Sequence, residues 1–293
     1  MDLFSEACKY YYYNYYVNYF KENKDLFYQN NPKIEKITEE ISKIKNDFKV
    51  KFPKRLYKYM SCDKFFEDNI KLICQKKVRY NSIKNFKDVH DFRLIIQNEN
   101  ILSEEDKDIV KKMNDHILGE NYRVFCVTEG YDNLYLWNNY SNNHNGFCIG
   151  FSFEEPFRTN DKDKINKILS CVKMRYSCNR SISAEDFSNL LNDQPDKLIY
   201  SVNLALITKY KTGEEEINGE KKYVEYFKEK EWRFLLQNNE NVEQDFDFFD
   251  SIYIGNKVSN NNRKILLETA KKNKLKCYQE NNDLEFDLIF DGK

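Results

Sequence analysis

No apolar run in this 293-residue sequence approaches the roughly 18 residues that a membrane-spanning helix needs. The first residues, MDLFSEACKYYYYNYY, also lack the basic segment followed by an apolar segment that begins a secretory signal. Lys and Arg number 47 against 48 Asp and Glu, so a formal net charge of -1 gives no global attraction to DNA or anionic lipid. We therefore expect a soluble, cytoplasmic protein without a membrane partner.

Metal-binding patterns are also missing. None of the 8 Cys forms a Cys-x-x-Cys pair, and the 3 His show no His-Glu-x-x-His spacing. We expect buried, reduced thiols and no metal. Gly-x-Gly-x-x-Gly and Walker sequences are absent too, which argues against phosphate loops of those types.

Aromatic residues are abundant by contrast. The chain has 22 Tyr and 22 Phe, although its mean hydropathy is -0.82 and 32% of its residues are charged. The core should therefore be aromatic, in one large domain or two small ones. Apolar residues recur every three or four positions between Leu26 and Phe48, which predicts helices before the boundary at Pro53. We expect a Tyr-rich helical segment over 1–52, which could bind a partner or a second copy, and a main domain over 53–293.

Strand and helix patterns alternate irregularly after Pro53. The sequence predicts strands over 56–60, 77–83, 123–128, 146–153, 229–236, 251–254 and near 276. It predicts helices over 64–71, 103–118, 133–140, 162–172, 184–191, 194–207 and 261–273, and a polar loop over 211–222. Because regular β-α-β spacing is absent, we expect the α+β class, with a central mixed or antiparallel sheet flanked by helices.

The sharpest local pattern is a pair of carboxylates. On a strand over 229–236, Glu229, Glu231 and Arg233 would share one face. Two neighbouring carboxylates can stabilise the oxocarbenium-like centre of glycosyl transfer. A solvated edge strand with a local contact between Glu231 and Arg233 is the structural alternative.

Two further patterns combine aromatic and polar residues. Trp137 and Tyr140 lie at i, i+3 on the helix over 133–140, where they could form an aromatic wall for a planar ligand or pack on the core. Asn139 and His144 could add polar contacts. In the strand near Pro53, Arg55, Tyr57 and Tyr59 share one face and Lys58 lies on the other.

Side chains of these types can hold a pyrophosphate and a ribose. An edge strand protected by charge explains the same strand pattern without a ligand.

Seven strings of the sequence, in their order and spacing, resemble a bacterial family known as domain of unknown function twenty-nine seventy-one. They are Leu56-Tyr57-Lys58-Tyr59, Phe86-Lys87-Asp88-Val89-His90-Asp91, Val124-Phe125-Cys126-Val127-Thr128-Glu129, Trp137-x-x-Tyr140, Gly146-Phe147-Cys148-Ile149-Gly150-Phe151, Glu229-x-Glu231-Trp232-Arg233 and Ile252-Tyr253-Ile254-Gly255. The resemblance covers about residues 53–275. That family looks like a distant relative of the ADP-ribosyltransferase fold.

The resemblance implies a site for NAD as the substrate, without a metal. It implies that Glu231 is the catalytic carboxylate and that Glu229 is the first residue of the Glu-x-Glu pair. It implies cofactor contacts from the residues Arg55, Tyr57, Lys58, Tyr59, Thr128, Trp137 and Tyr140. The expected function is then an NAD-consuming ADP-ribosyltransferase or NAD glycohydrolase, as a toxin or phage-defence effector acting on an unknown acceptor.

Two other classes remain open from the residues themselves. A non-catalytic module could bind a nucleotide or single-stranded nucleic acid by stacking on the aromatic residues. A structural protein could use the Tyr-rich segment 1–52 as its interface.

Overall fold

The computed structural model describes residues 52–86, 91–93, 95–118, 122–168, 170–177, 181–185, 187–188, 208–210, 212–217, 220–237, 242–281 and 284–292. The chain divides into two compact units. The first unit contains Met1–Phe52, Ile83–Tyr122 and Val172–Tyr226, and the second contains Pro53–Ser82, Arg123–Cys171 and Phe227–Lys293. Residues 53–293, predicted as one domain, therefore contribute to both units. The predicted helices over 1–51 and 194–207 lie outside the described residues.

The first unit contains one long helix and short strand pairs. Its elements are η2 (Ile83–Asn85), β4 (Ile95–Gln97), η3 (Glu99–Ile101), α4 (Glu104–Leu118), β8 (Arg175–Ser177), β9 (Ser181–Ser183), β10 (Thr208–Tyr210), β11 (Gly213–Ile217) and β12 (Glu220–Val224). The Ser103 hydroxyl accepts a hydrogen bond from the Asp106 amide at 3.0 Å, so the predicted start of the helix over 103–118 is confirmed.

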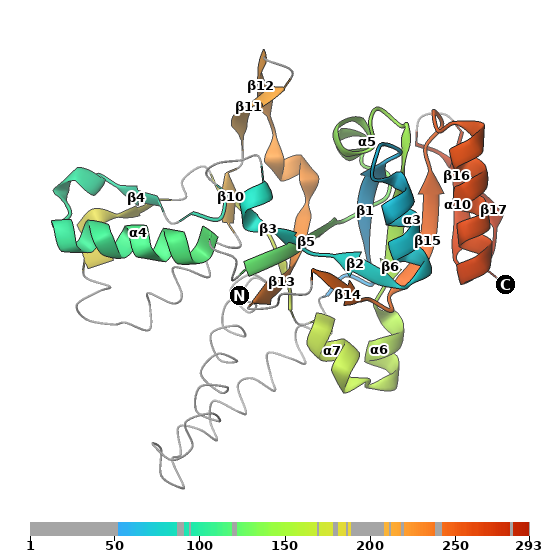
Figure 1. Cartoon of the computed structure of the whole chain (residues 1–293), viewed down its shortest axis with the longest axis horizontal. Coiled ribbons are helices and arrows are strands. Elements are labelled where there is room, and N and C mark those ends of the chain that lie inside the picture. Colours follow the sequence, from blue (N-terminus) through green and yellow to red (C-terminus); the bar gives the residue numbers. More distant parts are fainter. Residues whose placement is uncertain are drawn as a thin grey trace, which may run out of the picture. The chain divides into compact units, whose positions relative to one another are not determined.

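The segment over 211–222, predicted as a polar loop, is instead a β-hairpin of β11 and β12 (Figure 1). Glu215 lies opposite Lys222 and Glu216 opposite Lys221. The two strands pair through their backbones, which the polar composition of the segment does not indicate.

The second unit contains most of the nine-stranded sheet, whose order is β17-β16-β15-β6-β1-β5-β13-β7 with β3 beside β5. The sheet strands are β1 (Arg55–Ser61), β3 (Asn81–Ser82), β5 (Tyr122–Thr128), β6 (Gly146–Ser152), β7 (Cys171–Lys173), β13 (Glu231–Gln237), β15 (Phe249–Ile254), β16 (Lys276–Glu280) and β17 (Phe286–Phe290). The other elements are α3 (Phe66–Cys74), β2 (Lys77–Arg79), α5 (Leu134–Tyr140), α6 (Glu154–Thr159), α7 (Lys162–Ile168), η4 (Tyr226–Glu229), β14 (Glu243–Asp245) and α10 (Asn260–Asn273).

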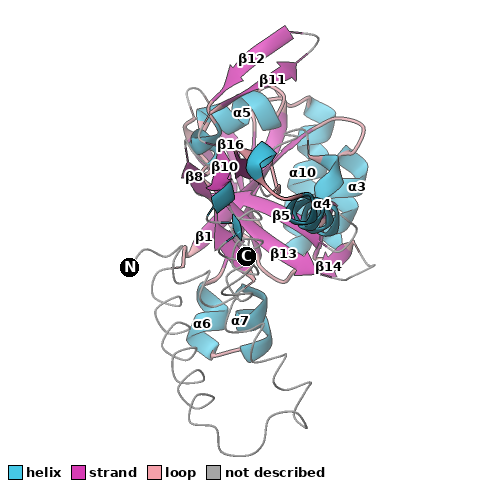
Figure 2. Ribbon diagram, turned by 90° about the vertical axis from the view of Figure 1, so that its left-hand side faces the viewer, coloured by secondary structure: helices cyan, strands magenta, loops and turns pink. Residues whose placement is uncertain are grey.

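The sheet is mixed, as predicted, and helices flank it. β15 and β16 run parallel, whereas β1 is antiparallel to both β5 and β6. The expected α+β class is therefore confirmed. Figure 2 shows α3 and α10 among the helices beside the strands. The helix predicted over 162–172 is shorter than expected, because α7 ends at Ile168 and residues from Cys171 form β7.

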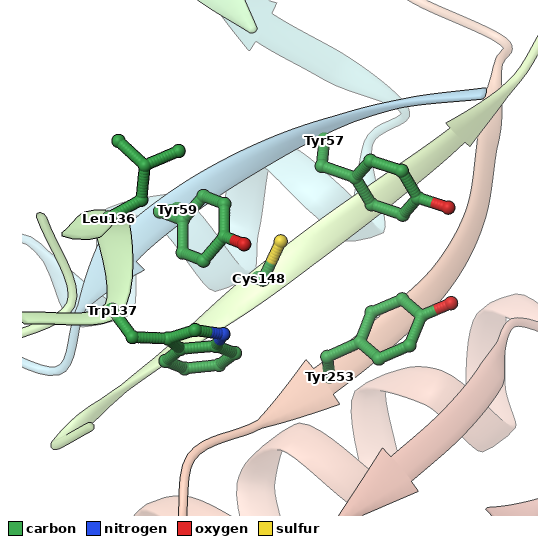
Figure 3. Close-up of a cluster of buried hydrophobic side chains, with 6 residues drawn as sticks. All are labelled: Tyr57, Tyr59, Leu136, Trp137, Cys148 and Tyr253. Atoms are coloured by element: carbon green, nitrogen blue, oxygen red, sulfur yellow. The ribbon is translucent and has the colours of Figure 1, made fainter. Parts of the chain in front are cut away.

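Successive side chains of β6 point to opposite faces of the sheet, so the strand contributes different residues to each face. Phe147 packs edge to face against Phe66 of α3, with ring centroids 5.9 Å apart, and Phe151 contacts Phe125 of β5. The opposite face carries Cys148 and Gly150. This second face is covered by a cluster of mostly aromatic side chains, shown in Figure 3 and called here the aromatic cluster: Tyr57, Tyr59, Leu136, Trp137, Cys148 and Tyr253.

Gly150 makes room for this cluster, and its replacement gives a first prediction. A Cβ at residue 150 would overlap Ser251 Oγ and lie 3.3 Å from the Tyr57 ring. We expect Gly150→Ala to lower the free energy of unfolding by about 1–3 kcal/mol, because overpacking forces neighbours apart. Urea denaturation measures this change.

The matched variant is Gly150→Ala combined with Ser251→Ala, which removes the nearest overlapping atom. It should recover part of the lost stability. Equal loss in the single and double variants would contradict the steric explanation.

Candidate active site

All nine predicted site residues lie in the second unit. They are carried by β1, β5, α5, η4 and β13, and they are Arg55, Tyr57, Lys58, Tyr59, Thr128, Trp137, Tyr140, Glu229 and Glu231. β1 and β5 are neighbours, with Tyr57 opposite Thr128, and β13 is the next strand in the sheet. The sheet order therefore brings together segments that are far apart in the sequence.

The two glutamates are not on the same strand, contrary to the sequence prediction. Glu229 ends the turn η4, Lys230 has a left-handed backbone with φ 47°, and β13 begins only at Glu231. A left-handed residue interrupts the extended chain, so strand alternation does not relate Glu229 to Glu231. The backbone alone therefore does not place the carboxylates of Glu229 and Glu231 side by side.

Three consecutive carbonyl groups fix this turn. The Lys228 carbonyl accepts from Asn133 Nδ2 at 2.7 Å, and the Lys230 carbonyl accepts from the Glu129 amide at 3.3 Å. Between them, the Glu229 carbonyl accepts from the Thr128 hydroxyl. These bonds hold the left-handed residue in place, because strained conformations persist only where surrounding contacts determine them.

Tyr140 contacts one of the two carboxylates directly and lies within the electrostatic influence of the other. Its hydroxyl donates to Glu229 Oε1 at 2.6 Å, and Glu229 is buried with 4% exposure, whereas the Tyr140 residue is 48% exposed. Burial of the hydroxyl raises the pKa of Tyr140 well above its usual value, and the charges of Glu229 and Glu231 raise it further. Both carboxylates therefore act on the same phenol.

Glu231 is held by an arginine two residues along β13. Arg233 Nε lies 2.8 Å from Glu231 Oε1, and Arg233 Nη2 lies 3.3 Å from Oε2. Arg233 is fully buried and Glu231 is 7% exposed. Such a two-point contact fixes the plane of the carboxylate and compensates its charge. Burial and the neighbouring Glu231 together raise the pKa of the Cys126 thiol.

The residues of the predicted aromatic wall lie at different depths. Trp137 is fully buried, donates from Nε1 to the Tyr131 carbonyl at 2.8 Å and packs edge to face on Tyr59. The Tyr59 hydroxyl in turn donates to the Gly130 carbonyl at 3.1 Å. Trp137 therefore supports the site from within the core, and only Tyr140 of the predicted pair is well exposed.

The two cationic residues of β1 lie on opposite faces of the sheet. Lys58 Nζ lies 5.6 Å from the centre of the Phe125 ring, on the face opposite Tyr57. Arg55 lies at the start of β1, where its Nε is 3.5 Å from Asp250 Oδ2. The structure does not bring Lys58 to the face that carries the other predicted residues.

An open groove of about 680 Å³ lies between α5 and η4. It is lined by Glu129, Gly130, Asp132, Asn133, Leu134, Tyr135, Asn138, Asn139, Phe227, Lys228 and Lys230. Lys228 and Lys230, which flank Glu229 in the sequence, are both exposed. The sequence did not predict this groove, because the left-handed turn that forms one wall has no periodic pattern.

His144 and Glu280 form a pair that the sequence analysis also missed. His144 Nδ1 lies 2.8 and 2.9 Å from the two carboxylate oxygens of Glu280, and Glu280 Oε2 accepts from the Asn256 amide at 2.9 Å. The imidazole stacks on Trp137 with centroids 5.6 Å apart. The pair therefore ties the loop after α5 to β16, and 136 residues of sequence separation hid it.

Among the described residues, no group of three or more His, Cys, Asp or Glu side chains could hold a metal ion. Within the same part of the chain, no helix is long and apolar enough to cross a membrane.

The fold and site define a mixed-sheet α+β protein with a buried Glu-x-Glu-x-Arg segment beside an open groove. Residues 136–234 match the model of the family described as Protein of unknown function (DUF2971), which supports a domain of that family in this chain. The match includes Tyr140, Glu229 and Glu231 but is shorter than the 53–275 expected from the sequence. No curated protein and no solved structure matches the chain.

Proposed function

We propose that the protein cleaves the bond between nicotinamide and ribose in NAD and passes ADP-ribose to a macromolecular acceptor or to water. The observation that supports this proposal most directly is the convergence of Tyr140, Glu229 and Glu231 next to an open groove. Breaking the glycosidic bond releases nicotinamide with the bonding electron pair and leaves positive charge on the ribose. A fixed carboxylate stabilises that charge.

Each residue then has a distinct task. Glu231, oriented by Arg233, faces the developing charge and accepts a hydrogen bond from the ribose 2′-hydroxyl. Glu229 accepts from Tyr140 and so fixes the phenol, whose exposed ring flanks the nicotinamide. Trp137 and Thr128 act through the scaffold, since they bond to the backbone of the loop after β5 and of η4.

The groove fits a dinucleotide in size and chemistry. Its volume of about 680 Å³ falls within the roughly 300–1,000 Å³ common for small-molecule sites. Tyr135 and Phe227 offer rings for stacking, and Lys228 and Lys230 offer charge for phosphates. The acceptor would be a cytoplasmic macromolecule, in keeping with a toxin or phage-defence effector.

The same lining supports a second candidate, a non-catalytic module for a nucleotide or single-stranded nucleic acid. Aromatic rings and lysines in one groove suit stacked bases and their phosphates. This candidate predicts oligonucleotide binding that weakens steeply as the salt concentration rises. It also predicts that NAD added to the protein is not cleaved. Fluorescence anisotropy with a labelled oligonucleotide, beside chromatography of incubated NAD, separates the two candidates.

Tyr140 gives a test of the proposed site. We expect Tyr140→Phe to lower kcat about tenfold with little change in KM, because Glu229 loses a hydrogen bond while the flanking ring remains. Tyr140→Ala should also raise KM. Steady-state kinetics of nicotinamide release measure both. If each variant matched the wild type, Tyr140 would have no place in the reaction.

A further inference from the structure

The nine-stranded sheet ends at β17, which pairs with β16 on one side and, among the described residues, with no strand on the other. The Asn281 amide donates to the Glu285 carbonyl at 2.9 Å, so the antiparallel ladder begins just before β17. In such a ladder, alternate residues turn their amide and carbonyl groups away from the neighbouring strand. Because Glu285 bonds toward β16, these groups of Phe286 and Leu288 face away from it. The backbone is therefore open to a further strand at this edge of the sheet.

Acidic and apolar side chains alternate over residues 285–288, which we name the β17 edge. Glu285 and Asp287 share one face of the extended chain, and both are exposed. Phe286 and Leu288 share the other face, where the Phe286 ring stacks on Trp137 of the aromatic cluster with centroids 5.7 Å apart. Leu288 extends this apolar face outward and is 50% exposed. A strand added here would meet carboxylates on one face and apolar side chains on the other.

The carboxylates of the β17 edge have no basic partner in the part of the chain that the structure describes. Asp287 accepts a hydrogen bond from Asn281 Nδ2 at 2.5 Å, and neither Asp287 nor Glu285 forms an ion pair with Lys or Arg there. Residues 284–292 contain three acidic residues and no Lys or Arg. The charge of this edge is therefore complementary to a basic partner.

We propose that the β17 edge binds an extended segment of another protein, in which basic and apolar residues alternate, as an added strand. Backbone hydrogen bonds supply affinity in this mode of recognition, and alternate side chains supply specificity. Residues opposite each other on paired strands share a face, so basic residues would meet Glu285 and Asp287 while apolar ones pack beside Leu288. The inference goes beyond the proposed function, because it requires neither NAD nor the groove.

A second copy of β17 is a poorer occupant. Antiparallel pairing of two copies centred on Phe286 would place Glu285 opposite Asp287, and pairing centred on Asp287 would place that residue opposite itself. Pairing centred on Leu288 would place Glu285 opposite Asp291. Like charges directly opposite each other destabilise paired strands. The charge pattern therefore favours a basic segment over a second copy.

Fluorescence anisotropy of the full chain with a labelled peptide of alternating Lys and Val tests this surface. A block peptide of the same composition, with all its Lys residues together, has the same charge but cannot confine Lys to one face of a strand. We expect the alternating peptide to bind about tenfold more tightly, because several cross-strand pairs form at once. Methylation of every backbone amide of the alternating peptide removes its donors and should abolish binding.

Charge reversal at the β17 edge separates recognition from folding. The double variant Glu285→Lys with Asp287→Lys should bind the Lys-Val peptide about tenfold more weakly and an alternating Glu-Val peptide more tightly, because both charge pairs change sign. A loss of folding would weaken both. Glu67→Lys is the matched control, since it reverses an exposed charge on α3 and should bind both peptides as the wild type does. If the double variant does not fold, Glu285→Lys alone should give the same opposite changes at a smaller size.

Three results would overturn the proposal. The first is equal binding of the alternating and block peptides, or binding that the charge reversal leaves unchanged. The second is no binding of the Lys-Val peptide, which would mean that the acidic residues only protect the edge. The third is a wild-type dimer in light scattering that Leu288→Asp dissociates, without peptide binding, which would assign the edge to a second copy. None of these results depends on nicotinamide release, so this proposal and the proposed function fail separately.

Discussion

Replacing Arg233 with methionine is expected to lower the free energy of unfolding by about 3–5 kcal/mol, because it leaves the carboxylate of Glu231 buried without its cation. Arg233 is fully buried and contacts both oxygens of Glu231. Removing one member of a buried ion pair lowers the free energy of unfolding by far more than the intact pair contributes to it. Urea denaturation followed by circular dichroism measures the loss.

The double variant Glu231→Leu with Arg233→Met separates charge from packing. Replacing a buried ion pair by apolar residues of similar volume is often neutral or stabilising. We therefore expect the double variant to recover most of the stability that Arg233→Met loses. A double variant as unstable as the single one would contradict the assignment of the loss to an uncompensated charge.

Replacing Glu231 with glutamine is expected to reduce nicotinamide release from NAD by about 100-fold or more, since the loss of one fixed electrostatic group commonly costs about 10²–10³ in rate. Gln keeps the shape of the side chain and removes the negative charge that the ribose cation needs. Chromatography of free nicotinamide over time measures the rate.

Glu243→Gln is the matched control. Glu243 also pairs with an arginine, Arg79, at 2.8 Å, but on β14 and β2, outside the nine-stranded sheet. The Glu243→Gln variant loses an ion pair between a glutamate and an arginine, as Glu231→Gln does, but it should release nicotinamide at the wild-type rate. Thermal unfolding of both variants shows how much folded protein each assay contains. Activity of Glu231→Gln within about threefold of the wild type would remove Glu231 from the mechanism.

Local patterns were enough to predict the strands and helices that support the site. Alternation of Phe147, Ile149 and Phe151 with small residues predicted β6, because one face of that strand packs on a helix. Asp132 and Asn133 were both possible caps for the helix predicted over 133–140, and in the structure the Asn133 side chain accepts from the Leu136 amide at the start of α5. Both signals act over a few residues, so the sequence alone contains them.

The contacts that shape the site depend on tertiary structure. Lys230 adopts a left-handed backbone that lysine rarely favours, and carbonyl contacts to the segment after β5 hold it there. No local pattern encodes such a turn, so Glu229 was expected on the strand. His144 and Glu280 meet only because β16 lies beside β15 in the sheet. Periodicity cannot report a pair of this kind.

The most direct test of the proposed reaction is a time course of free nicotinamide in solutions of NAD and the wild-type chain, with and without cell lysate as a source of acceptor. Mass spectrometry of the products would identify ADP-ribose, free or attached to a macromolecule. We predict many molecules of nicotinamide released per molecule of protein in at least one condition, with none from heat-denatured protein. Intact NAD in both conditions, beside folded protein, would contradict the proposed function.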